Sequence, residues 1–184
     1  MAFATTVDPN MYPNTVLRGM TVANFNQRVV QEVVVAVTPA SHYETSNAEL
    51  NHWRIFFMDA SGGSVAFDVV KRSGMDYTSQ LTVSSRDYGV SRSSVQVIPL
   101  PLGDQPFSAF QAWSVLASQG LLRYRYTQTG EGCRCWVRNA VQTLTNAHYL
   151  FYTAPNVLYA YLPLVWKKDG TTEQRVVAEG HYFS

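Results

Sequence analysis

Hydrophobic and polar positions follow two different periods along this chain, and the change of period separates a strand-rich first half from a largely helical second half. Arg28 to Thr38 is dense in valine, which predicts a strand buried on both faces because β-branched residues fit a pleated surface. His52 to Asp59 and Ser64 to Lys71 predict a hairpin around Ser61–Gly63, where glycine tolerates a positive φ. Two shorter runs predict further strands, at Gln80 to Ser84 and Val95 to Leu100.

Helical spacing begins after Pro101. Pro106 to Gln119 carries apolar residues every three to four positions and stops at Gly120, which predicts a helix. Cys133 to Ala147 repeats this spacing and predicts a second helix. Leu122 to Thr127 fits either a short strand or an extended segment. The structure of Leu158 to Val165 is left open, whereas Arg175 to Phe183 predicts a final strand.

Strands followed by helices and a closing strand predict an α+β fold rather than alternating βαβ units. We expect an antiparallel sheet or partial barrel of about five to six strands, packed against two to three helices. Residues 1–25 contain Asp8-Pro9-Asn10 and Tyr12-Pro13-Asn14, which predict an irregular N-terminal arm. Residues 26–184 then form a single domain.

The composition of the chain limits the kinds of molecule that we expect it to bind. The 184 residues carry a formal charge of +1 with no acidic or basic block, so neither nucleic acid nor an anionic membrane is an expected partner. Aromatic residues make up 13% of the chain, which suits a pocket for a small molecule, an ordinary core or a homodimer interface. No secretory signal or membrane span is evident, and we expect a cytoplasmic protein.

Cys133 is the first candidate for chemistry, because it follows Gly130-Glu131-Gly132 and opens a predicted helix. The positive end of a helix dipole favours a thiolate, which is the form of cysteine that attacks a substrate. A small buried thiol that only packs is the structural alternative. Cys135 lies on another face of the helix and is expected to be structural. The two cysteines are too close for an unstrained disulfide and too few for a zinc site, and no cofactor is expected.

His52 is the candidate base and Asp68 the candidate residue that orients it. Asp68 interrupts an apolar strand, and the hairpin brings it roughly opposite the start of the His52 strand. There it could accept a hydrogen bond from the imidazole, or it could pair with Arg54 or Lys71. His181, in the predicted last strand, is the alternative base.

Substrate contacts are expected from aromatic and basic residues near these positions: Trp53, Tyr126, Arg134 and Trp136. Arg123, Arg125, Arg134 and Arg138 cluster around the cysteine segment, where they bind an anion or pair with acids such as Glu131.

These motifs together resemble the circularly permuted papain-like proteins, whose NlpC-type and lecithin:retinol acyltransferase-like enzymes also place the histidine before the cysteine. His52-Trp53-Arg54-Ile55-Phe56 is similar to their His-Trp strand, and Cys133-Arg134-Cys135-Trp136-Val137 to their cysteine-led helix. The acyltransferase group usually has a second histidine where this chain has Asp68. The His-Trp strand, the Gly-Gly hairpin and the Gly-Cys-Arg-x-Trp segment resemble an uncharacterised fungal domain family still more closely.

The sequence therefore predicts a cysteine-dependent acyl-transfer enzyme acting on a small molecule, as an amidase, peptidase, thioesterase or acyltransferase. Cys133 would be the nucleophile, His52 the acid and base, and Asp68 the residue that orients His52. Two alternatives stay open. One is a cyclase or isomerase of natural-product biosynthesis on the same fold, and the other is a non-catalytic ligand-binding or dimerisation module.

Overall fold

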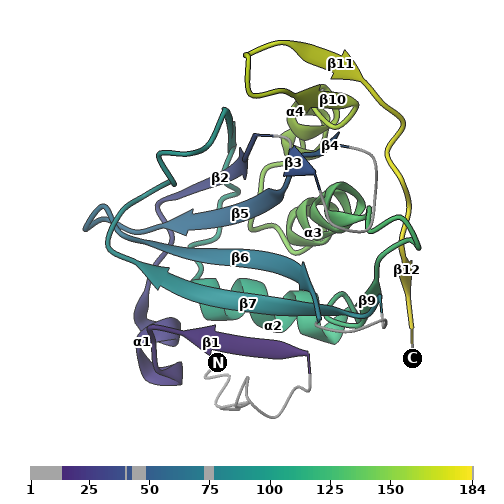
Figure 1. The fold of residues 1–184 in the computed structure, drawn as a ribbon. Coiled ribbons are helices and arrows are strands. Elements are labelled where there is room, and N and C mark those ends of the chain that lie inside the picture. Colours follow the sequence, from purple (N-terminus) through teal and green to yellow (C-terminus); the bar gives the residue numbers. More distant parts are fainter. Residues whose placement is uncertain (1–13, 40, 43–48, 73–76, 184) are drawn as a thin grey trace.

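A six-stranded sheet runs through the molecule in the order β1-β7-β6-β5-β2-β8, as the computed structural model in Figure 1 shows. The structure describes residues 14–39, 41–42, 49–72 and 77–183. The strands are β1 (Thr15–Arg18), β2 (Glu32–Val37), β5 (Trp53–Met58), β6 (Ser64–Lys71), β7 (Ser79–Arg86) and β8 (Gln96–Leu100). β1 pairs with β7 in parallel, and every other pairing in this sheet is antiparallel.

The described residues also form four helices and three small two-stranded sheets. The helices are α1 (Val22–Gln27), α2 (Ala109–Ser118), α3 (Cys133–Asn146) and α4 (Ala154–Tyr159). The small sheets pair β3 (Ser41–His42) with β4 (Glu49–Leu50), β9 (Tyr124–Arg125) with β12 (His181–Tyr182), and β10 (Leu164–Trp166) with β11 (Thr172–Gln174). The α+β class is confirmed, and the main sheet that the described residues form does not close into a barrel.

Successive side chains along each strand point to opposite faces of the sheet, and these two faces differ. One face packs against α2 and α3 in a single core that includes Val35, Phe67, Trp113 and Val141. The opposite face has a much smaller cluster, formed by Val34, Ala36, Phe56 and Ala66. β2 contributes to both clusters, which confirms the prediction of a strand buried on both faces.

The β5–β6 hairpin matches its prediction. Gly62 has a φ of 81°, and the Asp59 side chain accepts a hydrogen bond of 2.9 Å from the Ser61 amide. The register pairs Ile55 with Phe67. This hairpin therefore fixes which residues of β6 lie beside the beginning of β5.

The two predicted helices are confirmed with small changes at their ends. α2 begins after Ser108 rather than at Pro106, because Ser108 and Gln111 form a capping box. α3 begins at Cys133, as expected. The segment left open, 158–165, contains the end of α4 and the start of β10.

Two predictions about the ends of the chain are wrong. Residues 15–27 form β1 and α1, and Phe25 is fully buried in the main core, whereas the sequence predicted an irregular arm for residues 1–25. The N-terminal part of that arm, residues 1–13, lies outside the described residues. Within Arg175 to Phe183, only His181–Tyr182 is a strand. The rest runs alongside α3 without forming a ladder (Figure 1), and the Arg134 guanidinium takes the carbonyls of Arg175 and Val176.

Candidate functional site

The turn before α3 places Cys133 at the first position of the helix. Gly130 and Glu131 close this turn by donating to the Thr127 backbone carbonyl and side-chain hydroxyl, at 2.9 and 3.0 Å. Gly132 has a φ of 146°, and a Cβ atom there would lie 2.7 Å from the Tyr124 hydroxyl. Only glycine fits this close approach. Among the described residues no side chain caps the start of α3, so its first N–H groups remain available beside the Cys133 thiol.

His52 and Asp68 meet at the beginning of β5. His52 immediately precedes this strand, and its Nε2 atom hydrogen-bonds Oδ1 of Asp68 on β6. The second carboxylate oxygen of Asp68 forms an ion pair with Arg54, with an Nε–Oδ2 distance of 2.8 Å. The predicted alternatives for Asp68, orientation of His52 and a salt bridge to Arg54, are therefore both present.

These contacts set the protonation of the pair. Burial lowers the pKa of His52, but the hydrogen bond to Asp68 and the nearby Cys133 outweigh it and raise that pKa to about 9. Burial raises the pKa of Asp68, whereas the hydrogen bond and charge of His52 and the charge of Arg54 lower it more. At neutral pH the site therefore holds an imidazolium beside a carboxylate.

Cys133 and His52 line the same small pocket. The Cys133 thiol lies 3.5 Å from the backbone oxygen of Asn51, and the thiol is also one of the groups that raise the pKa of His52. Since Asp68 holds Nε2 of His52, Nδ1 is the nitrogen left to interact with Cys133. The structure thus brings together the three residues that the sequence singled out for chemistry.

Asn51 is a residue of this site that the sequence reasoning missed. Its side-chain amide donates to the Thr38 and Trp166 carbonyls at 2.8 Å each, and its Oδ1 accepts from the Trp166 amide at 2.7 Å. These bonds fix the backbone directly before His52. A polar Asn next to the candidate histidine was the available signal, but its partners are distant in sequence.

Of the four residues predicted to contact the substrate, Tyr126 and Arg134 line the pocket and the two tryptophans do not. Tyr126 lines it, with its hydroxyl donating to the Val69 carbonyl at 2.6 Å. Trp53 and Trp136 are each 1% exposed and belong to the core. The Trp136 indole donates to the Leu121 carbonyl at 2.9 Å, and Trp53 packs edge-on against Trp166. Tertiary packing buries both tryptophans away from the pocket.

Arg134 also lines the pocket, but its guanidinium serves the protein backbone. It donates to the Leu162 carbonyl at 2.9 Å and the Val176 carbonyl at 3.2 Å. Burial lowers the pKa of Arg134. The expected role in holding a substrate anion is therefore replaced by a structural one, since Arg134 fixes the chain that carries Ala178 along the pocket wall.

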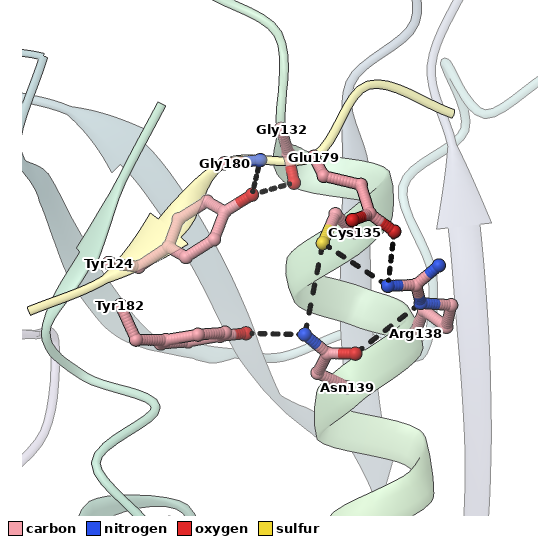
Figure 2. Close-up of polar contacts among 8 residues, drawn as sticks. All are labelled: Tyr124, Gly132, Cys135, Arg138, Asn139, Glu179, Gly180 and Tyr182. Carbon is pink, nitrogen blue, oxygen red and sulfur yellow. Dashed lines mark hydrogen bonds and ion pairs between the residues drawn. The ribbon is translucent and has the colours of Figure 1, made fainter. Parts of the chain in front are cut away.

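Cys135 faces away from the pocket, among the residues shown in Figure 2. Its sulfur lies 3.6 Å from the Arg138 guanidinium and 3.8 Å from the Asn139 amide. Arg138 pairs with Glu179 at 3.0 Å, and Asn139 donates to the Tyr182 hydroxyl at 3.0 Å. These contacts attach the C-terminal segment to α3. The structural role expected for Cys135 agrees with this environment.

The other predicted cations lie elsewhere. The Arg125 guanidinium stacks over the Phe183 ring, and the Arg123 backbone carbonyl accepts from the Phe183 amide. His181 is exposed on β12, opposite Arg125, and does not line the pocket of Cys133. His52, rather than His181, is the histidine that shares the site.

A family model described as a domain of unknown function (DUF7770) matches residues 33–183. The chain belongs to this family. The matched DUF7770 region contains His52, Asp68 and Cys133 together with the whole pocket. No curated protein and no solved structure matches the chain.

Two further observations bear on the site of this DUF7770 protein. In the described parts of the chain, no three His, Cys, Asp or Glu side chains lie together as a metal site would require. No helix among the described residues is long and apolar enough to cross a membrane. The chemistry that the site offers by itself is that of a thiol, an imidazole and a carboxylate.

Proposed function

We propose that this protein is a cysteine-dependent acyl-transfer enzyme, with Cys133 as nucleophile, His52 as acid and base, and Asp68 as the residue that orients His52. The observation that carries the proposal is the shared pocket: a thiol at the start of a long helix lines the same pocket as an imidazole whose Nε2 atom is held by a carboxylate. A base that lies beside a thiol in this way supports activation of the thiol as a nucleophile.

In the first half of the reaction, the Nδ1 proton of the His52 imidazolium comes from the Cys133 thiol before attack, and the sulfur then attacks the carbonyl carbon of the substrate. The carbonyl oxygen takes up the negative charge, which the uncapped N–H of Cys133 stabilises. The bond to the leaving group then breaks. That group departs with the proton from Nδ1, leaving a thioester on Cys133.

In the second half, an acceptor such as water, an amine or an alcohol attacks the thioester. Nδ1 of His52 takes the proton of the acceptor, and the carbon–sulfur bond breaks. Nδ1 keeps this proton, which restores the imidazolium, and the sulfur leaves the carbon as a thiolate. Asp68 stays a carboxylate throughout and stabilises the imidazolium by accepting from Nε2.

The pocket supports a small substrate. Apolar side chains from separate segments, including Leu50, Tyr126, Val165 and Ala178, lie beside the polar residues, and the pocket itself is small. Both cysteines are free thiols, which agrees with the reducing cytoplasm as the setting of the enzyme.

The test is the rate of Cys133 alkylation by iodoacetamide between pH 5 and 10 in the wild type and in His52→Ala. Cys133→Ser supplies the background from Cys135. We expect wild-type Cys133 to react readily at pH 6.5, and the His52→Ala variant to react at least about tenfold more slowly there. Equal profiles in both proteins, rising only in alkaline solution, would show that His52 does not activate the thiol.

A second measurement separates acyl transfer from the alternative chemistry. Intact-mass analysis after mixing with p-nitrophenyl acetate is expected to show one acetyl group on the wild type and none on Cys133→Ser. If a substrate is later turned over by Cys133→Ala but not by His52→Ala or Asp68→Asn, the site instead catalyses an acid–base cyclisation or isomerisation.

A further inference from the structure

Asp68 uses both of its carboxylate oxygens, and the two contacts come from neighbouring positions of one segment. Oδ1 meets Nε2 of His52, and Oδ2 lies 2.8 Å from Nε of Arg54. His52 and Arg54 are two residues apart, so both side chains leave the chain on the same side of the sheet. The Ile55–Phe67 pairing then places Arg54 directly across from Asp68.

Within the part of the chain that the structure describes, no further charged side chain anchors Asp68 in this way. On β7 the cross-strand partner of Asp68 is Thr82, which is uncharged. The charged groups that lower the pKa of Asp68 are His52 and Arg54. Cys133 acts on the pKa of His52. The side chains of His52 and Asp68 are 15% and 16% exposed and that of Arg54 is 29% exposed, so all three lie largely out of bulk water.

We propose that Arg54 is a positioning residue for the Cys133–His52 pair: it holds Asp68 in the orientation that directs Nδ1 of His52 towards Cys133. This inference rests on the proposed function for its catalytic meaning. A carboxylate with one anchor rotates about its side-chain bonds, whereas rotation of Asp68 would draw Oδ2 away from the charge of Arg54 with which it forms an ion pair. The imidazole that depends on Oδ1 keeps its orientation with it.

The position of Arg54 also matters during the reaction. When Nδ1 of His52 gives its proton to the leaving group, Asp68 loses the positive charge on one side. Arg54 retains the other charge, since a guanidinium stays protonated. Asp68 therefore remains ionised and in place when His52 must accept a proton from the second substrate.

The test compares Arg54→Met, which removes the charge, with Arg54→Lys, which keeps it. Arg28→Met is the matched control, because Arg28 pairs with Asp59 and has a side chain 30% exposed, close to that of Arg54. We expect Arg54→Met to slow Cys133 alkylation at pH 6.5 by about tenfold. Arg54→Lys is expected to recover most of that rate, and Arg28→Met to stay within about twofold of the wild type.

A readout that needs no thiol chemistry is the pH dependence of the His52 ring signals in NMR spectra. Protonation of Asp68 at acid pH perturbs these signals, and we expect that step to move to higher pH in Arg54→Met and back towards the wild type in Arg54→Lys. A step that stays in place in Arg54→Met overturns the proposal, as does alkylation equal to that of Arg28→Met when His52→Ala itself slows alkylation. Failure of the proposed function looks different, because His52→Ala would then leave alkylation unchanged while the NMR step still moves.

Discussion

His52 is the residue on which both the proposed chemistry and the stability of this site depend. Its pKa is raised from 6.5 to about 9 in the folded protein. A group whose pKa is higher in the folded state stabilises that state at low pH and loses the effect as pH rises through the folded value. The contribution of His52 is therefore complete below about pH 6.5 and disappears towards pH 9.

This linkage predicts how His52→Gln compares with the wild type in urea unfolding. The free energy by which the wild type exceeds the variant should fall by roughly 3 kcal/mol between pH 6.5 and 9, following the displacement of the pKa. Asp68 has the opposite sign, because its pKa is lowered. Its contribution is present above its ordinary pKa of 3.8 and is lost as pH falls below that range.

A companion series in the Asp68→Asn background serves as control. Without the carboxylate, His52 loses the hydrogen bond that most strongly raises its pKa. In this background, the difference in the free energy of unfolding between proteins with His and with Gln at position 52 should change little between pH 6.5 and 9. An unchanged fall would mean that another group holds the proton on His52.

At the scale of elements, α3 and the C-terminal segment depend on each other. Arg134, in the first turn of α3, donates to carbonyls of Leu162 and Val176, while Arg138 pairs with Glu179 one turn later. On the far side of the segment, Gly180 donates to the Tyr124 hydroxyl at 3.1 Å, which itself donates to the Gly132 carbonyl at 2.8 Å. The segment is thus tied to the same turn that presents Cys133.

We predict that Arg134→Met releases this segment, whereas Arg138→Met does not. Loss of Arg134 leaves the buried Leu162 carbonyl and the part-buried Val176 carbonyl without this donor, at a cost of about 1–3 kcal/mol. The Arg138–Glu179 pair is exposed on the glutamate side and contributes less than about 1 kcal/mol. Hydrogen exchange of residues 175–180 should accelerate at least about tenfold in Arg134→Met only. Equal exchange in the two variants would contradict this division of roles.

At the scale of the whole molecule, the two faces of the sheet differ in what they contribute to stability. Phe67 lies in the main core against the helices, and Phe56 lies in the four-residue cluster on the opposite face. We predict that Phe67→Ala lowers the free energy of unfolding by about 3–5 kcal/mol and Phe56→Ala by about 2–3 kcal/mol. Urea denaturation of both variants measures the difference. A larger loss for Phe56→Ala would show that the small cluster, not the main core, dominates.

Local patterns are enough to predict the parts of the fold that depend on local physics. The valine run predicts β2, the Gly62–Gly63 turn predicts the β5–β6 hairpin, and apolar spacing predicts α2 and α3. The same hairpin pattern is sufficient to predict that Asp68 lies near His52, where the two side chains meet. In each of these cases the signal and the contact lie in the same stretch of sequence.

The errors concern contacts between distant segments. β1 is a strand because its backbone pairs with β7, more than sixty positions away, as in the Thr15–Leu81 pair. Residues 175–180 look like a strand in sequence, but Arg134 takes the carbonyls of Arg175 and Val176. Trp53 and Trp136 stand next to site residues in the chain and still point into the core. The spacing of hydrophobic residues within a segment does not indicate which distant residues that segment will contact.

The attachment of the C-terminal segment to α3 also has a consequence for biosynthesis. Ala178 forms part of the pocket wall, and the ribosome makes it after His52, Asp68 and Cys133. Because a chain folds as it emerges, the sheet and the helices can assemble before this wall exists. A nascent chain would then carry the thiol and the imidazole in an open groove, and the pocket closes around them only after Ala178 has been made.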